Sequence, residues 1–305
     1  MKEISAMHHC VREEEEGKMV RQVLRNRFRF SRRMFRRLKE AKAVEVNGEK
    51  VFLTSRVHKG DWIQIRLPHD TGEGMVPQPI PVDVLYEDED LIVLDKQPGV
   101  VVHPTKNHPD QTLANGLAHY WRERGEFHLI RPVTRLDKDT SGLIVFAKHA
   151  HAHAVLSGQM KKKRYHREYL AVVYGMLEQN EGVIRAPIAR SSENSNLRVV
   201  STQGVEAITR YRVVERLKGA TLVRVGLETG RTHQIRVHMA DLGHPLIGDT
   251  MYGGVPLLER QALHALYLQL IHPRDGSIRS WESPLPSDIH QLLTKLRLYG
   301  IKELH

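Results

Sequence analysis

Residues 131–148 read RPVTRLDKDTSGLIVFAK, and the two halves of this stretch differ in character. The second half, GLIVFAK, is a continuous apolar run, which is typical of a strand buried on both faces. The first half is polar and rich in turn-forming residues, so it predicts a loop that leads into the buried strand. A loop held by a core strand can position a reactive side chain, which makes Asp137 and Asp139 candidates for chemistry. The same residue types also build ordinary turns, and turn chemistry alone favours neither reading.

Around this stretch, short apolar runs alternate with a few helical segments. The runs typical of strands are VDVLYE, LIVLDK, GLIVFAK, YLAVVYG, AITRYRVVER, TLVRVGLE and LYLQLIH. Helices are expected near residues 111–123, 149–161, 230–243 and 286–299. Strands outnumber helices without regular alternation, which predicts an α+β fold with a mostly antiparallel mixed sheet over residues 82–305.

The N-terminal part of the chain is strongly basic. Residues 12–68 hold 16 Lys or Arg and 8 Asp or Glu, whereas the whole chain has a formal charge of +10. Apolar residues from Met19 to Leu24 recur at helical spacing, and Ser31 is the expected N-cap of a second helix. AVEVNGEKVF, with Asn47-Gly48 between two apolar runs, predicts a hairpin, and DWIQIRL predicts a further strand.

The second helix carries an arginine-rich face opposite its apolar one. The arginines are Arg32, Arg33, Arg36 and Arg37. Guanidinium groups suit phosphates and base stacking, so we expect residues 12–68 to be a small α+β RNA-binding domain; the alternative is a solvated charged helix. Four prolines and two glycines in residues 68–81 predict an irregular segment, and residues 69–81 are expected to be a linker.

Two further stretches offer polar groups. KKKRYHREYLAVVYG, residues 161–175, places Tyr165 and Tyr169 at the entry of a strand beside a basic cluster. Such a tyrosine is usually a packing residue, although the basic neighbours would suit a phosphate backbone. LETGRTHQIRVHMADLGHPLIGDTMYGG, residues 227–254, predicts a strand that turns into a helix near Arg231, where this arginine could pair with a carboxylate or bind phosphate.

These three stretches, in this order, resemble the RluA-type pseudouridine synthase family, which acts on ribosomal and transfer RNAs. The likeness covers residues 82 to about 284, and the VNGE turn and the V-x-K-G-D-W-I ending of residues 12–68 resemble the RNA-binding domain of the S-four ribosomal protein. The resemblance implies an isomerase in which Asp137 is the nucleophile, Tyr169 the active-site tyrosine and Arg231 the partner of the aspartate. It also implies that Arg135 fills the space left by a flipped base, and we count Arg236 among the RNA-binding residues.

One position departs from the family. Thr134 stands where the family usually has a histidine before Arg-Leu-Asp, which puts a hydrogen bond of the loop in doubt but not the reaction. The implied reaction breaks the bond between the ribose anomeric carbon and the uracil nitrogen, rotates the base and rejoins it through carbon five. A carboxylate can attack the anomeric carbon or assist formation of a glycal, and both routes stay open.

Other functions remain as alternatives. The basic domain alone would fit a non-catalytic RNA-binding protein, and a glycoside or nucleoside hydrolase would also use an aspartate. His149, His151 and His153 in KHAHAHA would suggest a metal site, but no cysteine or acidic pair accompanies them in the sequence. We expect no metal and no cofactor. A single cysteine, no apolar run of membrane-spanning length and no signal sequence lead us to expect a cytoplasmic protein, which we take to be a monomer.

Overall fold

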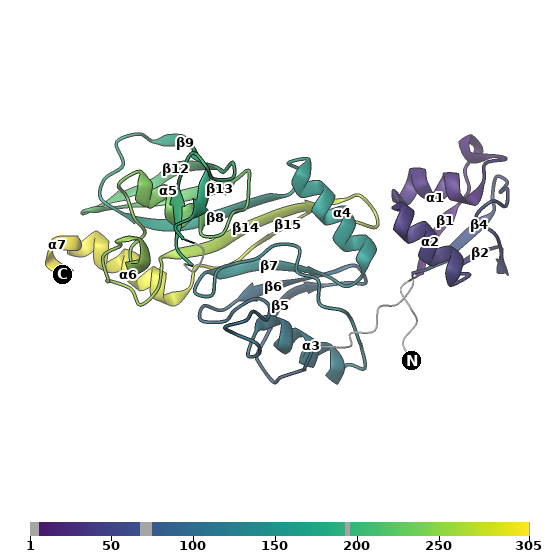
Figure 1. Ribbon diagram of the computed structural model, residues 1–305, viewed down its shortest axis with the longest axis horizontal. Helices are drawn as coiled ribbons and strands as arrows, with labels where there is room; N and C mark the ends of the chain where they lie inside the picture. The colour runs from purple at the N-terminus through teal and green to yellow at the C-terminus, as the bar shows by residue number, and fades with distance from the viewer. Residues whose placement is uncertain (1–5, 68–74, 193–195, 305) are drawn as a thin grey trace.

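The computed structural model describes residues 6–67, 75–192 and 196–304, which form a small N-terminal and a large C-terminal domain (Figure 1). The N-terminal domain contains a four-stranded antiparallel sheet in the order β1-β4-β2-β3. Its elements are β1 (Ala6–Cys10), the 3-10 helix η1 (Glu13–Glu15), α1 (Val20–Phe28), α2 (Arg32–Glu40), β2 (Val44–Val46), β3 (Glu49–Lys50) and β4 (Trp62–Arg66). Strand β1 lies before residue 12, so the sheet starts earlier in the chain than the expected domain.

The local signals of this domain are confirmed. The Ser31 hydroxyl accepts a hydrogen bond from the Met34 N–H at 3.2 Å and thereby caps α2. Asn47 and Gly48 have φ values of 52° and 85°, the two positive angles that a two-residue hairpin turn requires. The apolar faces of α1 and α2 pack on β4 in a core of their own.

The C-terminal domain is built on a nine-stranded sheet. Its order is β5-β6-β7-β14-β8-β13-β12-β9, with β15 paired to β14. The strands are β5 (Asp83–Glu87), β6 (Leu91–Lys96), β7 (Ser141–Ala147), β8 (His166–Tyr174), β9 (Glu181–Arg185), β12 (Ile208–Leu217), β13 (Ala220–Leu227), β14 (Leu263–Ile271) and β15 (Ile278–Glu282). Only β7 and β14 pair in parallel, which confirms the expected α+β fold with a mostly antiparallel mixed sheet.

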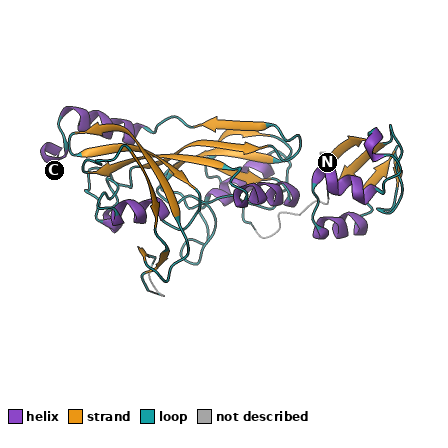
Figure 2. Ribbon diagram, turned by 90° about the horizontal axis from the view of Figure 1, so that it is seen from above, coloured by secondary structure: helices purple, strands orange, loops and turns teal. Residues whose placement is uncertain are grey.

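Helices cover the sheet at its two ends (Figures 1 and 2). They are α3 (Leu113–Glu123), α4 (Ala150–Lys161), α5 (Gln234–Asp241), the 3-10 helix η2 (Thr250–Tyr252), α6 (Ser287–Leu298) and α7 (Ile301–Leu304). The four helices expected from the sequence correspond to α3, α4, α5 and α6. A two-stranded sheet, β10 (Ile188–Arg190) and β11 (Arg198–Val200), projects from the body (Figure 2). Within the described part of the chain, no helix combines the length and the apolar character needed to cross a bilayer.

Strand β7 lies inside the large sheet, between β6 and β14, and all its residues are buried. Only glycine fits at position 142 of this strand. Gly142 has a φ of 105°, and a Cβ atom there would lie 2.3 Å from the Ala265 carbonyl oxygen of β14. The close parallel approach of β7 and β14 therefore requires glycine at the end of the RLDKDTSG loop. This geometry fixes the direction in which the loop leaves the sheet.

The second half of the expected linker packs against the C-terminal domain. Asn115 of α3 donates a hydrogen bond to the Val76 carbonyl at 2.8 Å, and Ile80 lies against Gly116. This segment forms no regular element, as its prolines predict, but it is held by α3. The first half, residues 69–74, lies outside the described residues.

The two domains touch through the end of the sheet and α4. A guanidinium nitrogen of Arg274 donates to the Ala6 carbonyl at 2.9 Å, and the Phe30 ring packs edge-on against His151 with ring centroids 4.6 Å apart. The arginine-bearing helix α2 directly follows Phe30, so it lies near this junction.

Candidate active site

The loop that carries Asp137 is held by buried donors. The Lys96 ammonium donates to the Lys138 carbonyl at 2.8 Å, and Arg260 donates to the Asp139 carbonyl at 3.0 Å. Burial lowers the pKa of Lys96 to about 7. The Thr140 N–H closes the turn on the Asp137 carbonyl at 3.1 Å. Because these anchors come from β6, from the segment before β14 and from the loop itself, the Asp137 carboxylate starts from a fixed backbone.

Arg236 is the basic partner of Asp137. Its Nη1 lies 3.3 Å from Oδ2 of Asp137, while its Nε and Nη2 form a bidentate pair with the Asp249 carboxylate at 2.6 and 2.8 Å. Asp249 and Arg236 are almost fully buried, whereas the Asp137 side chain is 25% exposed. A planar guanidinium clamped in this way can present its remaining edge to one fixed position. Arg236 therefore bridges the buried Asp249 and the candidate nucleophile Asp137.

The expected pair of Arg231 with Asp137 is corrected by this geometry. The sequence predicted a helix from residue 230, but α5 begins at Gln234, so Arg231 lies in the preceding turn and is exposed. Its Nε donates to the Glu206 carbonyl at 3.0 Å. Arg236 instead lies in the first turn of α5, on the side that faces Asp137 and Asp249. Arg231 remains on the wall of the cavity described below.

Tyr169 lies on β8 in the register that places it opposite Ala265 of β14. Its side chain is buried next to Asp137 and Arg167. Burial raises the pKa of Tyr169, Arg167 opposes this change and the Asp137 charge adds to it. The phenol is thus neutral near pH 7, which favours packing and hydrogen bonding over action as a base.

A cavity of about 920 Å³ opens in front of Asp137. Its basic lining residues are Arg135, Lys161, Lys163, Arg167, Arg210, Arg231 and Arg236, against the acidic residues Asp137, Glu168 and Glu228. This volume and positive surplus suit a nucleotide with its phosphates. Arg167 also lines the cavity, and among the described residues its buried Nε has no hydrogen-bond partner.

Sequence reasoning missed three residues of this site. Asp249, His233 and Tyr252 all belong to the stretch of residues 227–254 that was singled out. Each nitrogen of the His233 ring has a polar neighbour. Nδ1 lies 2.9 Å from the Tyr252 hydroxyl, and Nε2 lies 4.0 Å from Oδ2 of Asp137. An Asp-x-x-Tyr segment after a glycine was a usable signal, but nothing in the sequence shows which side chain it meets.

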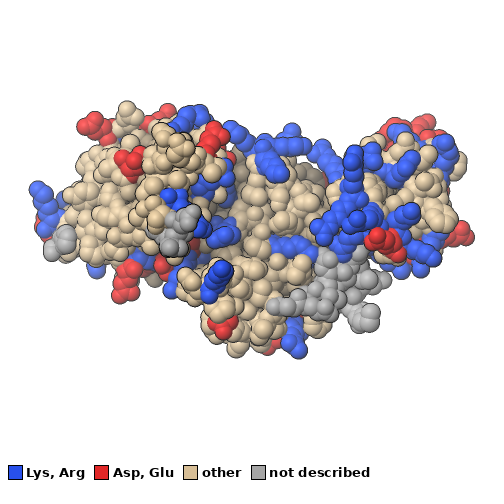
Figure 3. Space-filling view, in the orientation of Figure 1, with Lys and Arg blue, Asp and Glu red and all other residues tan. Residues whose placement is uncertain are grey.

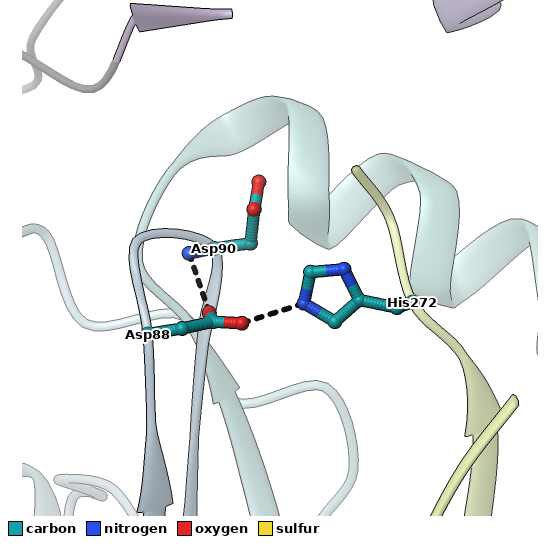
Figure 4. Close-up of side chains that lie close together, drawn as sticks. All are labelled: Asp88, Asp90 and His272. Atoms are coloured by element: carbon teal, nitrogen blue, oxygen red, sulfur yellow. Dashed lines mark hydrogen bonds and ion pairs between the residues drawn. The ribbon is translucent and has the colours of Figure 1, made fainter. Parts of the chain in front are cut away.

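A second cluster of titratable groups lies at the other end of the sheet, where the β5–β6 turn meets the end of β14 (Figure 4). Asp88 accepts from the His272 ring at 2.6 Å and from the Asp90 N–H at 2.8 Å. Asp90 accepts from His149 at 2.8 Å and from Arg274 at 2.6 Å. These bonds tie the turn to α4 and to the segment that contacts the N-terminal domain, a structural role.

The histidines of KHAHAHA are part of the same packing. Nδ1 of His149 accepts the Ala152 N–H at 3.1 Å and caps α4, while its Nε2 faces Asp90. His151 is buried against Phe30. Both ring nitrogens of His149 are therefore engaged within the protein, which explains this histidine without a ligand.

Lys and Arg side chains gather over the N-terminal domain and toward its junction with the C-terminal domain (Figure 3). On α2, Arg32, Arg33 and Arg36 are exposed, and Arg37 is half-buried. Arg36 has a loose ion pair with Glu40 at 3.9 Å. The expected arginine face is thus present on the surface of α2.

Comparisons with known proteins cover both domains. Residues 90–241 match the family described as RNA pseudouridylate synthase, and residues 7–63 match the RluD ribosomal pseudouridine synthase N-terminal domain. An uncharacterized RNA pseudouridine synthase of Bacillus subtilis (strain 168), YhcT, is 40% identical over 288 residues, which cover 92% of this chain and 94% of the relative. Ribosomal large subunit pseudouridine synthase D of Pasteurella multocida (strain Pm70) is 37% identical over 284 residues, or 88% of this chain and 87% of the relative. The solved structure of human RNA Pseudouridylate Synthase Domain Containing 1 matches with a TM-score of 0.56 and 26% identity, covering 72% of this chain and 96% of that one.

Proposed function

The chain belongs to the RNA pseudouridylate synthase family and is an RNA pseudouridine synthase, and on this basis we propose that Asp137 is its nucleophile and ribosomal RNA its substrate. The observation that carries the first part is the position of Asp137. Its carboxylate lies at the wall of a basic cavity, on an anchored loop, with Arg236 at one oxygen. We also propose the division into an RNA-binding domain, a linker and a catalytic domain, and a monomer that acts in the cytoplasm.

The two oxygens of Asp137 have different surroundings, and this difference supports its role. Among the described residues, the contacts of its carboxylate with Arg236 and His233 are both made at Oδ2. Oδ1 is therefore the oxygen that can approach the ribose anomeric carbon or assist formation of a glycal. The Arg236 guanidinium places a positive charge 3.3 Å from Oδ2, beside the carboxylate that either route uses.

Tyr169 and Arg231 have supporting roles in this proposal. The buried, neutral phenol of Tyr169 forms a wall against which the uracil ring packs while it is detached. Arg231, at the exposed rim of the cavity, binds a phosphate of the RNA rather than the aspartate. Pseudouridine formation is an isomerisation, so these groups need to bind, orient and move protons only.

Arg135→Ala is expected to impair paired substrates more than unpaired ones. Arg135 is exposed at the cavity beside Asp137, where its guanidinium can occupy the space that a flipped base leaves. Flipping costs a few kcal/mol in a duplex and less in a loop. Single-turnover rates of the variant and the parent protein on one target uridine, placed in a helix and in a loop, measure the difference. Equal losses of single-turnover rate on both RNAs would contradict this role of Arg135.

Replacing Arg32, Arg33 and Arg36 together by Gln is expected to weaken RNA binding without slowing the bound complex. Each lost phosphate contact reduces the magnitude of the slope of log affinity against log salt by about 1. The slope of the triple variant should therefore be smaller in magnitude by about 2 to 3. Affinity titrations at several salt concentrations measure it, with Lys295→Gln and Lys302→Gln at the other end of the molecule as a control. An unchanged slope would mean that α2 does not contact the RNA.

Ribosomal RNA is the proposed substrate because of the relatives. The N-terminal match is a RluD ribosomal pseudouridine synthase domain, and one relative is named for the large ribosomal subunit. Mapping pseudouridines in total RNA from a strain without this protein tests it. Loss of a site in large-subunit ribosomal RNA, restored by the intact gene but not by Asp137→Asn, is the expected result. Loss of pseudouridine sites only in transfer RNA would show that transfer RNA, and not ribosomal RNA, is the substrate.

A further inference from the structure

His233 and Tyr252 form a pair behind Asp137. His233 precedes α5 in a left-handed backbone conformation with a φ of 56°, which is uncommon for a residue with a Cβ atom. Tyr252, from η2, meets it edge-on with ring centroids 5.8 Å apart. The Arg236 guanidinium lies 5.0 Å over the Tyr252 ring, so the pair packs on the residue that already holds Asp137.

The hydrogen bonds of Tyr252 favour one tautomer of His233. The Tyr252 oxygen accepts the Arg198 backbone N–H at 3.0 Å. The Tyr252 O–H proton then needs an acceptor, and Nδ1 of His233 lies 2.9 Å away. Burial lowers the pKa of His233, so the ring is neutral near pH 7. A neutral ring that accepts at Nδ1 has its proton on Nε2.

In this tautomer the Nε2–H group lies near the oxygen of Asp137 that Arg236 also contacts. The distance from Nε2 to Oδ2 is 4.0 Å, compared with 3.3 Å from Nη1 of Arg236. Catalytic hydrogen bonds are often long in a free enzyme and shorten in the complex. Once both donors bond to Oδ2 in the complex, the carboxylate cannot rotate to exchange its oxygens without losing both.

We propose that His233 is a positioning residue for this reaction: Tyr252 holds it in the Nε2–H tautomer, and with Arg236 it fixes Oδ2 of Asp137 so that Oδ1 faces the ribose. The inference rests on the proposed role of Asp137, but its first step, the tautomer, belongs to the free protein.

Nuclear magnetic resonance of the full chain labelled with ¹⁵N-histidine tests this step without RNA. The His233 signals are those that disappear in His233→Gln. The Nε2–H tautomer is expected in the parent protein, and a mixture of tautomers in Tyr252→Phe, which lacks the hydroxyl. Tyr299→Phe, an exposed tyrosine at the end of α6, is the control. A parent protein in the Nδ1–H tautomer would overturn the proposal.

Two amide replacements test the second step on the RNA that the mapping identifies. Gln can place an amide nitrogen near the position of Nε2, whereas Asn places it near Nδ1. His233→Ala and His233→Asn are expected to slow single turnover about 10- to 100-fold with RNA affinity unchanged, and His233→Gln to recover part of this loss. His244→Gln, a histidine bonded to the Tyr174 carbonyl away from the cavity, is the control.

The outcomes distinguish a failure of the role of His233 from a failure of the proposed function. Equal rates of His233→Ala and the parent protein, or equally slow His233→Gln and His233→Asn in folded proteins, would overturn the role of His233. A parent protein that forms no pseudouridine would overturn the proposed function, whereas the tautomer would still be read from the spectra.

Discussion

Asp137→Asn is expected to abolish pseudouridine formation while leaving RNA binding intact. The amide has nearly the shape of the carboxylate, so the loop anchored by Lys96 and Arg260 stays in place. It lacks the negative charge that attacks the anomeric carbon or assists glycal formation, and the expected loss in single-turnover rate is about 10⁴-fold or more. Affinity for the same RNA should stay within about threefold, because only one charge in a large interface changes.

The control for this variant is Asp139→Asn, in the same loop but without a contact to Arg236 among the described residues. It should keep most of the activity. If Asp137→Asn and Asp139→Asn lose activity equally, the loop has a structural role only. If Asp137→Asn keeps its activity, the nucleophile lies elsewhere in the cavity.

Arg236→Gln is expected to lower both stability and activity. Asp249 is 1% exposed, and without the bidentate guanidinium its carboxylate would be buried and unpaired. Breaking a buried pair in this way costs about 3–5 kcal/mol in the free energy of unfolding, which urea titration measures. The rate of pseudouridine formation falls as well, because Oδ2 of Asp137 loses its charged donor.

A double variant separates the two effects of Arg236. In Arg236→Gln/Asp249→Asn the buried uncompensated charge is gone, so most of the lost stability should return. The rate should stay low, since nothing replaces the donor to Asp137. A double variant that recovers both stability and rate would show that Arg236 acts only through the fold.

The Asp137 loop was predictable from sequence because one local sequence pattern indicates both the loop and the strand that follows it. A polar turn before a continuous apolar run can be placed without tertiary information, and β7 is buried as this pattern requires. The hairpin at Asn47-Gly48 and the Ser31 cap are local in the same sense. Each depends on residues within a few positions of one another.

The partner of Asp137 was not predictable in this way. Arg231 and Arg236 are five residues apart, and which of them faces Asp137 depends on where α5 begins, the least certain feature of any helix predicted from sequence. The approach of Asp137 to His233 and to the Arg236–Asp249 pair depends on the order of the large sheet. Strand β14 enters between β7 and β8, and no local pattern encodes this position. Short strands such as β10 and β11 also lacked a clear pattern.

The most direct test of the central claim is to incubate the purified full chain with unmodified large-subunit ribosomal RNA and to map pseudouridine and released base together. New pseudouridine at defined positions, none with Asp137→Asn and no free uracil in either reaction, is the predicted result. Release of free uracil would mean hydrolysis instead of isomerisation. Pseudouridine formed equally by the Asp137→Asn protein would contradict the assignment of Asp137 as the nucleophile.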